Sequence, residues 1–246
     1  MKFLEKIWTS DLSITGTENP VGDQALLEIK TVIDTIEELF PSKHGRYVDR
    51  GKSVMRLCET VVKTDGSGLL SYVDLLEFVN YTSPQDFTGL MKGLAIQAIS
   101  DVLLKGGEKS FTISFGSDVM TVNRPVTLVS KYNPKFKIEL GNGCAFTSGN
   151  DVMERGNHVK VYEENPYVVI HLIDDTGFRP VFCDFAATHI YSKLSLVKKW
   201  PFLKVIGMRA DGRAELLCDG IVSKEEGIVS SDETKNDTET EEVKDA

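Results

Sequence analysis

The sequence predicts an α+β fold: a helical N-terminal half, then a mostly antiparallel β-rich C-terminal half and a disordered acidic tail. Apolar residues recur every three or four positions up to Gly107 and mainly at every second position beyond it. Strands and helices do not alternate regularly, so a parallel sheet built from βαβ units is not expected. From Lys224 onward the chain is acidic and lacks aromatic residues, which leaves too little apolar surface to fold.

Four helices are expected in the first region, residues 1–107. The clearest spans residues 20–40, where Ile29, Ile33 and Ile36 lie on one apolar stripe and Pro41 stops the helix. Weaker helical patterns cover residues 53–62, 71–79 and 86–104.

The second region, residues 108–223, is expected to form the sheet. Short β-rich runs such as FTISF, FKIEL and YVVIHLI are separated by turn residues such as Asn133-Pro134 and Asp211-Gly212. One helix near residues 186–199 interrupts the series. We expect both regions to form one compact unit, followed by the tail at 224–246.

Composition excludes several classes of protein. The 246 residues are 41% hydrophobic and 26% charged, as in ordinary globular proteins, and no apolar run is long enough to cross a membrane. The charged N-terminus does not resemble a signal peptide, so a cytoplasmic protein is expected. Cys58, Cys144, Cys183 and Cys218 lack clustered metal-ligand spacing. No metal or cofactor is predicted.

The stretch KTDGSGLLSYVD lies between two expected helices and resembles the calcium-binding loop of the EF-hand family. Asp65, Ser67 and Gly68 match the third, fifth and sixth loop positions. The resemblance implies a calcium site, but Lys63 stands at the first ligand position and Asp74 replaces the long glutamate at the twelfth. These departures favour a helix–helix turn, which the same glycines would form.

Gly51-Lys52-Ser53 opens an expected helix and resembles the P-loop family, which implies nucleoside triphosphate binding. Arg46 stands where that motif needs its first glycine, and a helix precedes the segment instead of a strand. The run YVVIHLIDD, ending in Asp174 and Asp175, would suit the magnesium-binding strand of such a site. An NTP- or metal-dependent enzyme is therefore one alternative function.

Asp184 and His189, joined by Asp174 or Asp175, are the best acid–base candidates, because all are titratable and lie near expected strand ends. The sequence contains no G-x-S-x-G nucleophile motif. No catalytic residue is assigned.

Charge is unevenly distributed along the chain. The net charge is −9, and the tail contributes −6 of it through nine acidic residues and three lysines. Segment 189–213 is basic, and aromatic side chains lie among its cations, a mixture that suits single-stranded nucleic acid. The expected contacts are Lys131, Tyr132, Lys135, Lys137, Tyr191, Lys193, Lys198, Lys199, Trp200, Lys204, Arg209 and Arg213.

The sequence thus favours a non-enzymatic protein that binds single-stranded RNA or DNA through its β-rich half. The acidic tail would modulate that binding or recruit a basic protein partner. The first alternative is a structural or assembly protein that forms a homo-oligomer. In that case Trp200 and Phe202 close a core and the lysines around them form its solvated face.

Overall fold

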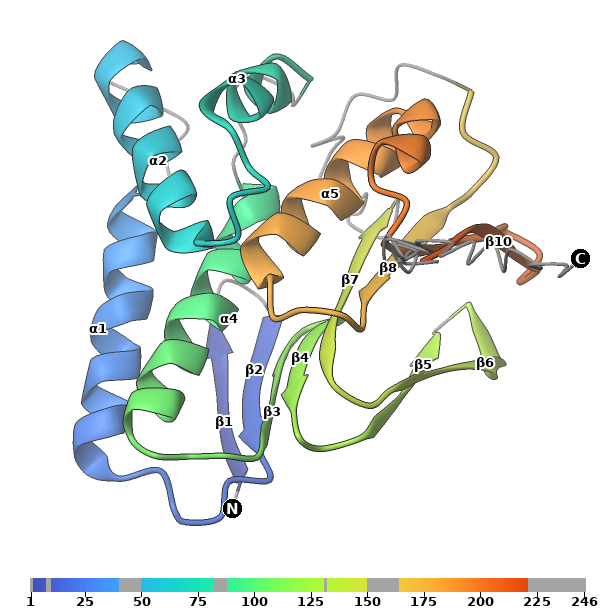
Figure 1. Ribbon diagram of the computed structural model, residues 1–246. Helices are drawn as coiled ribbons and strands as arrows, with labels where there is room; N and C mark the ends of the chain where they lie inside the picture. The colour runs from blue at the N-terminus through green and yellow to red at the C-terminus, as the bar shows by residue number, and fades with distance from the viewer. Residues whose placement is uncertain are drawn as a thin grey trace, which may run out of the picture.

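The computed structural model describes residues 2–7, 10–39, 50–81, 88–130, 132–149 and 164–220. Its strands are β1 (Lys2–Ile7), β2 (Ser10–Thr15), β3 (Phe111–Phe115), β4 (Asp118–Val122), β5 (Val126–Ser130), β6 (Asn133–Leu140), β7 (Gly143–Gly149), β8 (Val169–Asp174), β9 (Lys204–Met208) and β10 (Ala214–Asp219). Eight of them form one antiparallel sheet in the order β1-β2-β3-β4-β7-β8-β9-β10. The β5–β6 hairpin stands apart from it (Figure 1).

Helices cover one face of the sheet. The helical elements are α1 (Asp23–Leu39), α2 (Arg50–Asp65), α3 (Tyr72–Tyr81), α4 (Thr88–Lys105), α5 (Pro180–Ser192) and the short 3₁₀ helix η3 (Leu194–Lys199). α4 and α5 lie directly on the sheet, α1 packs beside α4, and α2 contacts both α4 and α5 (Figure 1). In the part of the chain that the structure describes, no helix is long and apolar enough to cross a membrane.

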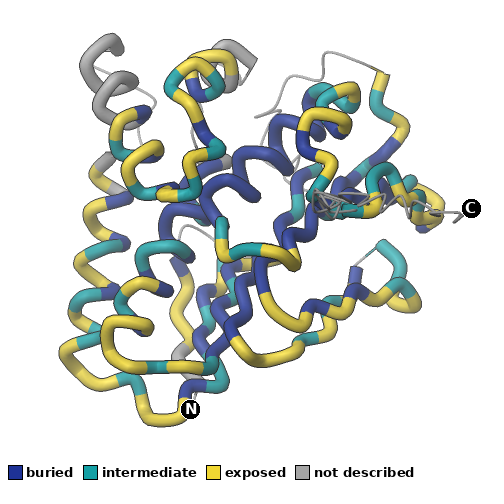
Figure 2. Tube along the Cα trace, viewed as in Figure 1, coloured by how far each residue is buried: buried dark blue, intermediate teal, exposed yellow. Residues whose placement is uncertain are grey.

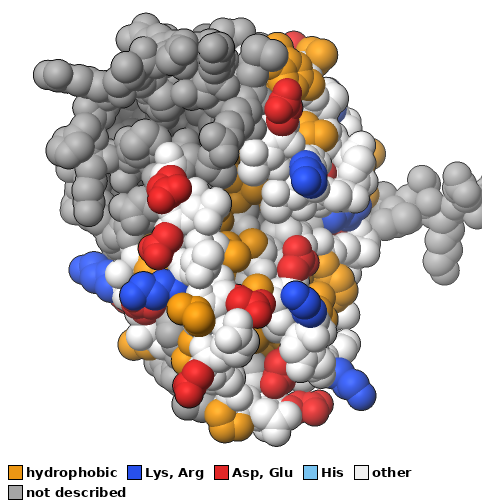
Figure 3. All heavy atoms as spheres, turned by 90° about the vertical axis from the view of Figure 1, so that its left-hand side faces the viewer, with side chains coloured by type: hydrophobic (Ala, Val, Ile, Leu, Met, Phe, Trp, Pro, Cys, Tyr) orange, Lys and Arg blue, Asp and Glu red, His pale blue; other side chains and the backbone are white. Residues whose placement is uncertain are grey.

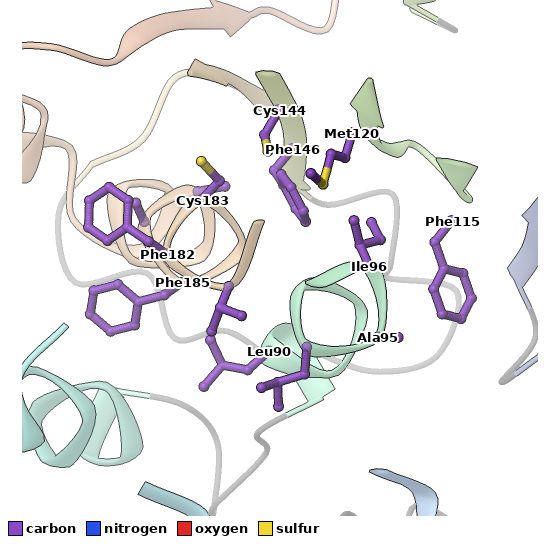
Figure 4. Packing of buried hydrophobic residues seen from close by; sticks show 14 of the residues in the cluster. Leu90, Ala95, Ile96, Phe115, Met120, Cys144, Phe146, Phe182, Cys183 and Phe185 are labelled. Carbon is purple, nitrogen blue, oxygen red and sulfur yellow. The ribbon is translucent and has the colours of Figure 1, made fainter. Parts of the chain in front are cut away.

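The core has two parts because side chains alternate between the faces of each strand. On β8, Ile170 and Leu172 face the helices, while Ile173 faces the β5–β6 hairpin. Phe115, Phe146 and other large side chains of the sheet point toward α4 and α5 (Figure 4). Buried positions accordingly run along both helices and the central strands (Figure 2).

α5 is the most deeply placed helix. All of its residues are buried, because the sheet lies on one side of it and α2, α4 and η3 pack around it. A helix that is mainly apolar all round suits this position. Asp184 and His189, which both have ionisable side chains, are therefore buried inside the protein.

α1 shows the opposite distribution. Ile29, Ile33 and Ile36 are buried, as their spacing predicts, whereas Leu27 is 59% exposed. Acidic and basic side chains are interspersed with apolar ones on the side of the molecule that α1 forms (Figure 3). This is the ordinary pattern of a solvated surface.

The aromatic residues near the end of α5 belong to the core. Trp200 is only 6% exposed, and its ring centroid lies 5.5 Å from that of Phe182 and 6.0 Å from that of Phe185. Phe182 also stacks on Phe202 at 5.9 Å. These edge-on and stacked contacts are favourable aromatic geometries in protein interiors.

The α+β class is confirmed, with helices on a mostly antiparallel sheet. A purely helical N-terminal half is not, because the described chain begins with β1 and β2, which continue the sheet beyond β3. The helix expected at 186–199 instead begins at Pro180 and ends at Ser192. The run VKVYE (residues 159–163), another of the short β-rich runs from which a strand is expected, and the acidic tail lie outside the described residues. The boundary at residue 107 stays a prediction.

Replacing Trp200 with alanine should lower the free energy of unfolding by about 3–5 kcal/mol, because it empties a buried aromatic site. Replacing the neighbouring exposed Lys198 with alanine should change it by no more than about 0.5 kcal/mol. Chemical denaturation of the two variants and the unaltered protein measures both values. Equal, small effects would contradict the buried position of Trp200.

Candidate functional site

α4 and α5 cross at a glycine, and the crossing places a carboxylate against the backbone of α4. A Cβ atom on Gly93 would lie 2.7 Å from the carbonyl oxygen of Pro180 and 2.8 Å from the Cβ atom of Asp184. Glycine is required for this close approach. The backbone N–H of Gly93 donates a 2.7 Å hydrogen bond to Oδ2 of Asp184, which is 7% exposed.

The residue before this glycine brings a cation to the same place. Nζ of Lys92 lies 2.9 Å from Oδ2 of Asp118, and the lysine side chain is 31% exposed whereas the aspartate side chain is 3% exposed. Asp118 follows the tight β3–β4 turn, in which Gly116 has a φ of 64°. A Cβ atom on Gly116 would lie 3.5 Å from Nζ of Lys92. The lysine side chain therefore ends over this turn and is partly exposed.

The two carboxylates and the ammonium group affect one another. Burial raises the pKa of Asp184 well above its ordinary value, and the nearby charge of Asp118 adds to the effect. The Gly93 N–H and the charge of Lys92 act in the opposite direction. The pKa of Lys92 is raised, chiefly by Asp118. Lys92 is therefore a cation at neutral pH, and Asp184 takes up a proton more readily than an exposed aspartate.

Asp118 also connects this group to a histidine. Its Oδ1 accepts a 2.9 Å hydrogen bond from the backbone N–H of Thr147, whose hydroxyl lies 3.1 Å from Nδ1 of His171. Burial lowers the pKa of His171 to about 4, although Asp118 opposes this shift. The other ring nitrogen, Nε2, is buried and has no hydrogen-bond partner. The imidazole is therefore neutral at pH 7, and its Nε2 is enclosed by protein atoms.

We call Lys92, Asp118, Thr147, His171 and Asp184 the polar edge cluster. They come from five elements that meet near one edge of the sheet, where α4 and β4 begin and β7 ends (Figure 1). Thr147 and His171 are direct cross-strand partners of β7 and β8. Side chains alternate between the faces of a strand, so Thr147 and His171 lie on the hairpin face with Ile173, whereas Lys92 and Asp184 lie on the helix face. Lys92 with its carboxylate partners is able to bind an anionic group, and Asp118 connects it to His171 through the backbone N–H of Thr147.

A second buried polar group has a structural role. Arg179 donates two hydrogen bonds, of 2.7 and 2.6 Å, to the carboxylate of Asp174, which also accepts bonds from Thr176. These contacts close the turn between β8 and α5. Sγ of Cys183 lies 3.8 Å from the same carboxylate, and burial together with the neighbouring Cys144 raises the pKa of the Cys183 thiol. Both thiols are fully buried and unreactive in this state.

The acid–base trio expected from the sequence does not assemble. The carboxylate of Asp174 is paired with the guanidinium group of Arg179, and Asp175 is exposed. Asp184 and His189 lie five residues apart on the single helix α5, which puts them about 140° apart around its axis. His189 instead lies among Phe185 and Trp200, and burial lowers its pKa to about 4. Only Asp184 belongs to the polar edge cluster.

The expected nucleic-acid contacts also do not form one surface. Three of the cations pair with carboxylates: Lys199 with Asp74 at 2.8 Å, Arg209 with Glu215 at 2.5 Å and Arg213 with Asp211 at 2.7 Å. The aromatic Tyr191 and Trp200 are buried, where bases could not stack on them. Lys135, Lys137 and Lys198 are exposed, Tyr132, Lys193 and Lys204 are partly buried, and Lys131 lies outside the described residues.

The two loop motifs have ordinary structural roles in what the structure describes. Gly66 and Gly68 have positive φ in the turn between α2 and α3, and the carboxylate of Asp65 caps the N–H of Ser67. Gly51, Lys52 and Ser53 lie in the first turn of α2. Within the described ranges, no group of three or more His, Cys, Asp or Glu side chains could hold a metal ion.

Lys92, Asp118, Thr147 and His171 were not selected from the sequence as site residues. One signal was available for Lys92, which is a charged residue in the otherwise apolar stretch GLMKGLAI. Lysine in a buried helix needs a charged partner. Nothing local identifies that partner, because Asp118 lies 26 residues further along the chain.

No family model and no curated protein matches this sequence. Solved structures do match its fold. Flavin transferase ApbE from Vibrio cholerae, in a histidine-to-glycine mutant, has a TM-score of 0.59 and 10% identity, covering 89% of this chain and 98% of its own. The flavinyl transferase ApbE of Pseudomonas stutzeri has a TM-score of 0.59, 12% identity and coverages of 88% and 93%. The ApbE protein of Thermotoga maritima has a TM-score of 0.56, 12% identity and coverages of 88% and 96%.

The sequence-based expectation of a protein that binds single-stranded nucleic acid is therefore wrong. The chain shares its fold with flavin transferases over 88–89% of its length. The mixture of cations and aromatic residues that suggested nucleic acid arises because core aromatics and paired surface cations alternate along one segment.

The two histidines should make the protein less stable as the pH is lowered from 6.5 to about 4, because His171 and His189 are neutral when folded but protonate in the unfolded chain. The raised pKa of Asp184 acts in the opposite direction. Both folded histidine pKa values lie below the unfolded value, so the unfolded state binds more protons at these two residues in this window. The loss is at most about 1.4 kcal/mol per pH unit for each histidine. Denaturation at several pH values measures it.

The His171→Asn variant should show a shallower pH dependence than the unaltered protein. All other titrating groups, including Asp184, are present in both proteins, so their contributions cancel in the comparison. Identical slopes would show that His171 is not buried as a neutral ring.

Proposed function

We propose that this protein is a flavin transferase, which binds a flavin nucleotide at the polar edge cluster and transfers the flavin to an acceptor protein. Two findings support the proposal. The fold is shared with flavin transferases from two bacteria and with an ApbE protein from a third, over 88–89% of this chain. On the helix side of the sheet, the polar edge cluster supplies a partly exposed cation that could hold the phosphate of a flavin nucleotide. The second finding is the one that carries the proposal, because a shared fold alone does not define an activity.

The cluster suits the phosphate part of a flavin nucleotide. Lys92 is a partly exposed cation held at a fixed place by Asp118. It lies in the second turn of α4, an 18-residue helix whose N-terminus is at the same edge. The partial positive charge of a helix N-terminus and a lysine beside it both attract phosphate oxygens. Riboflavin, which has no phosphate, should therefore bind more weakly than its phosphorylated forms.

FAD is the donor that the chemistry favours, because its pyrophosphate contains an activated P–O–P bond. A hydroxyl group of the acceptor attacks the flavin-side phosphorus, a new P–O bond forms, and the bond to the adenosine phosphate breaks. The flavin phosphate is then esterified to the acceptor, AMP leaves, and the hydroxyl proton passes to a base. With water in place of the acceptor, the products are FMN and AMP.

The described residues fit roles in this step. Lys92 would stabilise the negative charge that develops on the phosphate oxygens. His171 is neutral at pH 7, but its Nε2 is enclosed on the hairpin face of the sheet, away from Lys92. It would accept the hydroxyl proton only if the acceptor displaced the residues that cover it. Asp118 touches neither partner in this scheme but fixes Lys92 directly and His171 through Thr147.

The first test is binding. Titration of the protein with riboflavin, FMN and FAD, followed by flavin fluorescence, should show saturable binding that is strongest for the phosphorylated forms. Lys92→Ala should weaken FAD binding by about tenfold or more, the effect of losing one charge-assisted contact. Lys105→Ala, which removes an exposed lysine from the other end of the same helix, is the matched control and should not change it. Equal affinity for all three flavins would contradict a phosphate site at Lys92.

The second test is turnover. FAD incubated with the protein should yield FMN and AMP, separable by chromatography, even without an acceptor. His171→Asn should reduce the rate by about a hundredfold or more, the typical contribution of a general base, with a smaller effect on FAD affinity. Absence of any FAD cleavage and of flavin binding, with and without added divalent cations, would refute the proposed function.

A further inference from the structure

The β5–β6 hairpin crosses the face of the sheet that the helices leave open. Its inward side chains, including Ile138 and Leu140, pack on residues of four strands, which are Val119 of β4, Ala145 of β7, Ile173 of β8 and Ile206 of β9. Lys135, Lys137 and Glu139 alternate with the inward residues and are exposed. The hairpin is thus an amphipathic strap that packs on the central strands, and Figure 1 shows it as a unit separate from the main sheet.

The free end of this strap is fastened to the far side of the sheet. Nδ2 of Asn133 donates a 2.9 Å hydrogen bond to the carbonyl oxygen of Gly212, in the turn between β9 and β10. Gly212 has a φ of 82°, and a Cβ atom there would lie 3.2 Å from the carbonyl oxygen of Tyr132. Oδ1 of Asn133 also accepts the N–H of Lys135, which fixes the side chain of the asparagine. The strap is therefore held at both ends.

The strap places one aromatic ring on the histidine of the polar edge cluster. The ring of Phe136 stacks on that of His171, with centroids 6.3 Å apart and an angle of 28° between the planes. Phe136 is partly buried and packs against the same cluster of residues as Ile138. On its other side the imidazole is bonded to the Thr147 hydroxyl. Phe136 and Thr147 therefore restrict both the tilt and the rotation of the ring.

We propose that Phe136 is a positioning residue for His171, and that the β5–β6 strap, latched by Asn133, holds its ring in place. The phenyl ring shields the imidazole from water. The hydrogen bond between Nδ1 and the Thr147 hydroxyl then sets the direction in which Nε2 points. This inference rests on the proposed flavin transfer only for the role that it gives the positioned imidazole, which is to accept a proton. The contact itself and its effect on the histidine are independent of any ligand.

The environment of the imidazole supports this assignment. Desolvation is the largest cause of its lowered pKa, and part of the surface that excludes water is the strap. The charged groups near it are few. Asp118, paired with Lys92, lies beyond Thr147, and Lys204 of β9 is the cross-strand partner of Ile173. The charged residues of β6 face away from the sheet.

The test is NMR of the protein with ¹⁵N-labelled histidine, with His171→Asn used to assign the signals. Phe136→Ala should raise the pKa of His171 from about 4 by about one unit or more toward 6.5, because water reaches the ring. Phe136→Tyr keeps an aromatic ring and should restore the low pKa. Lys137→Ala, on the outer side of the same strand, should leave the signals unchanged.

Asn133→Ala provides a second route to the same result, because it releases the latch while leaving Phe136 in the chain. It should raise the pKa of His171 in the same direction by a smaller amount. Thermal melting shows whether each variant is folded, and Phe136→Leu, which preserves apolar volume, replaces the alanine variant if that one unfolds. An unchanged His171 pKa in folded Phe136 variants would overturn the inference.

Turnover separates this inference from the proposed function. If His171 must be neutral to accept a proton, FAD cleavage by the unaltered protein falls only as the pH approaches about 4. In Phe136→Ala the decline should begin at higher pH, by the same shift that NMR reports. Unaltered protein that neither binds nor cleaves FAD would refute the proposed function while the NMR result still decides the role of Phe136. A decline at the same pH in both proteins, despite a shifted pKa, would show that Phe136 does not position His171 for the reaction.

Discussion

The carboxylate of Asp118 joins more elements of this protein than any other side chain of the polar edge cluster. One oxygen binds the ammonium group of Lys92 on α4, and the other accepts the backbone N–H of Thr147 on β7. Through the Thr147 hydroxyl the connection reaches His171 on β8. A buried carboxylate is stable only when its oxygens are satisfied in this way. The position of the cation and the orientation of the imidazole therefore depend on the same residue.

The approach of α5 completes this arrangement. Asp184 reaches the backbone of α4 only because Gly93 has no side chain. The same close packing buries Asp184, and this burial is the main cause of its raised pKa. Helix packing and the electrostatics of the candidate site thus have a common cause in one glycine.

Much of the fold is predictable from the periodic spacing of apolar residues, but its first two strands are not. The buried stripe of α1 follows directly from the spacing of Ile29, Ile33 and Ile36. β1 is an edge strand with lysine and glutamate among its residues, and such a strand lacks the apolar run that marks a buried one. Its membership of the sheet depends on pairing with β2, and that of β2 on pairing with β3, almost a hundred residues away.

The site is less predictable than the fold, because each of its contacts joins distant segments. Lys92 and Asp118 are separated by 26 residues, and Gly93 and Asp184 by 91. The periodic spacing of apolar residues identifies which residues are buried, but it does not identify which buried polar side chains contact one another. The aromatic and basic residues of segment 189–213 show the reverse problem. They are adjacent in sequence, yet Trp200 faces the core while Lys199 pairs with Asp74 outside it.

The charge balance of the polar edge cluster also limits how it can accept a phosphate. One cation, Lys92, serves two buried carboxylates, and Asp184 is the carboxylate whose pKa is already raised. A phosphate beside Lys92 adds negative charge to the cluster and raises the pKa of Asp184 further. If a phosphate binds there as proposed, protonation of Asp184 becomes more favourable, because it removes one of the competing charges without moving Lys92. The burial of Asp184 at the helix crossing would in this way let a site with more carboxylates than cations bind an anionic nucleotide.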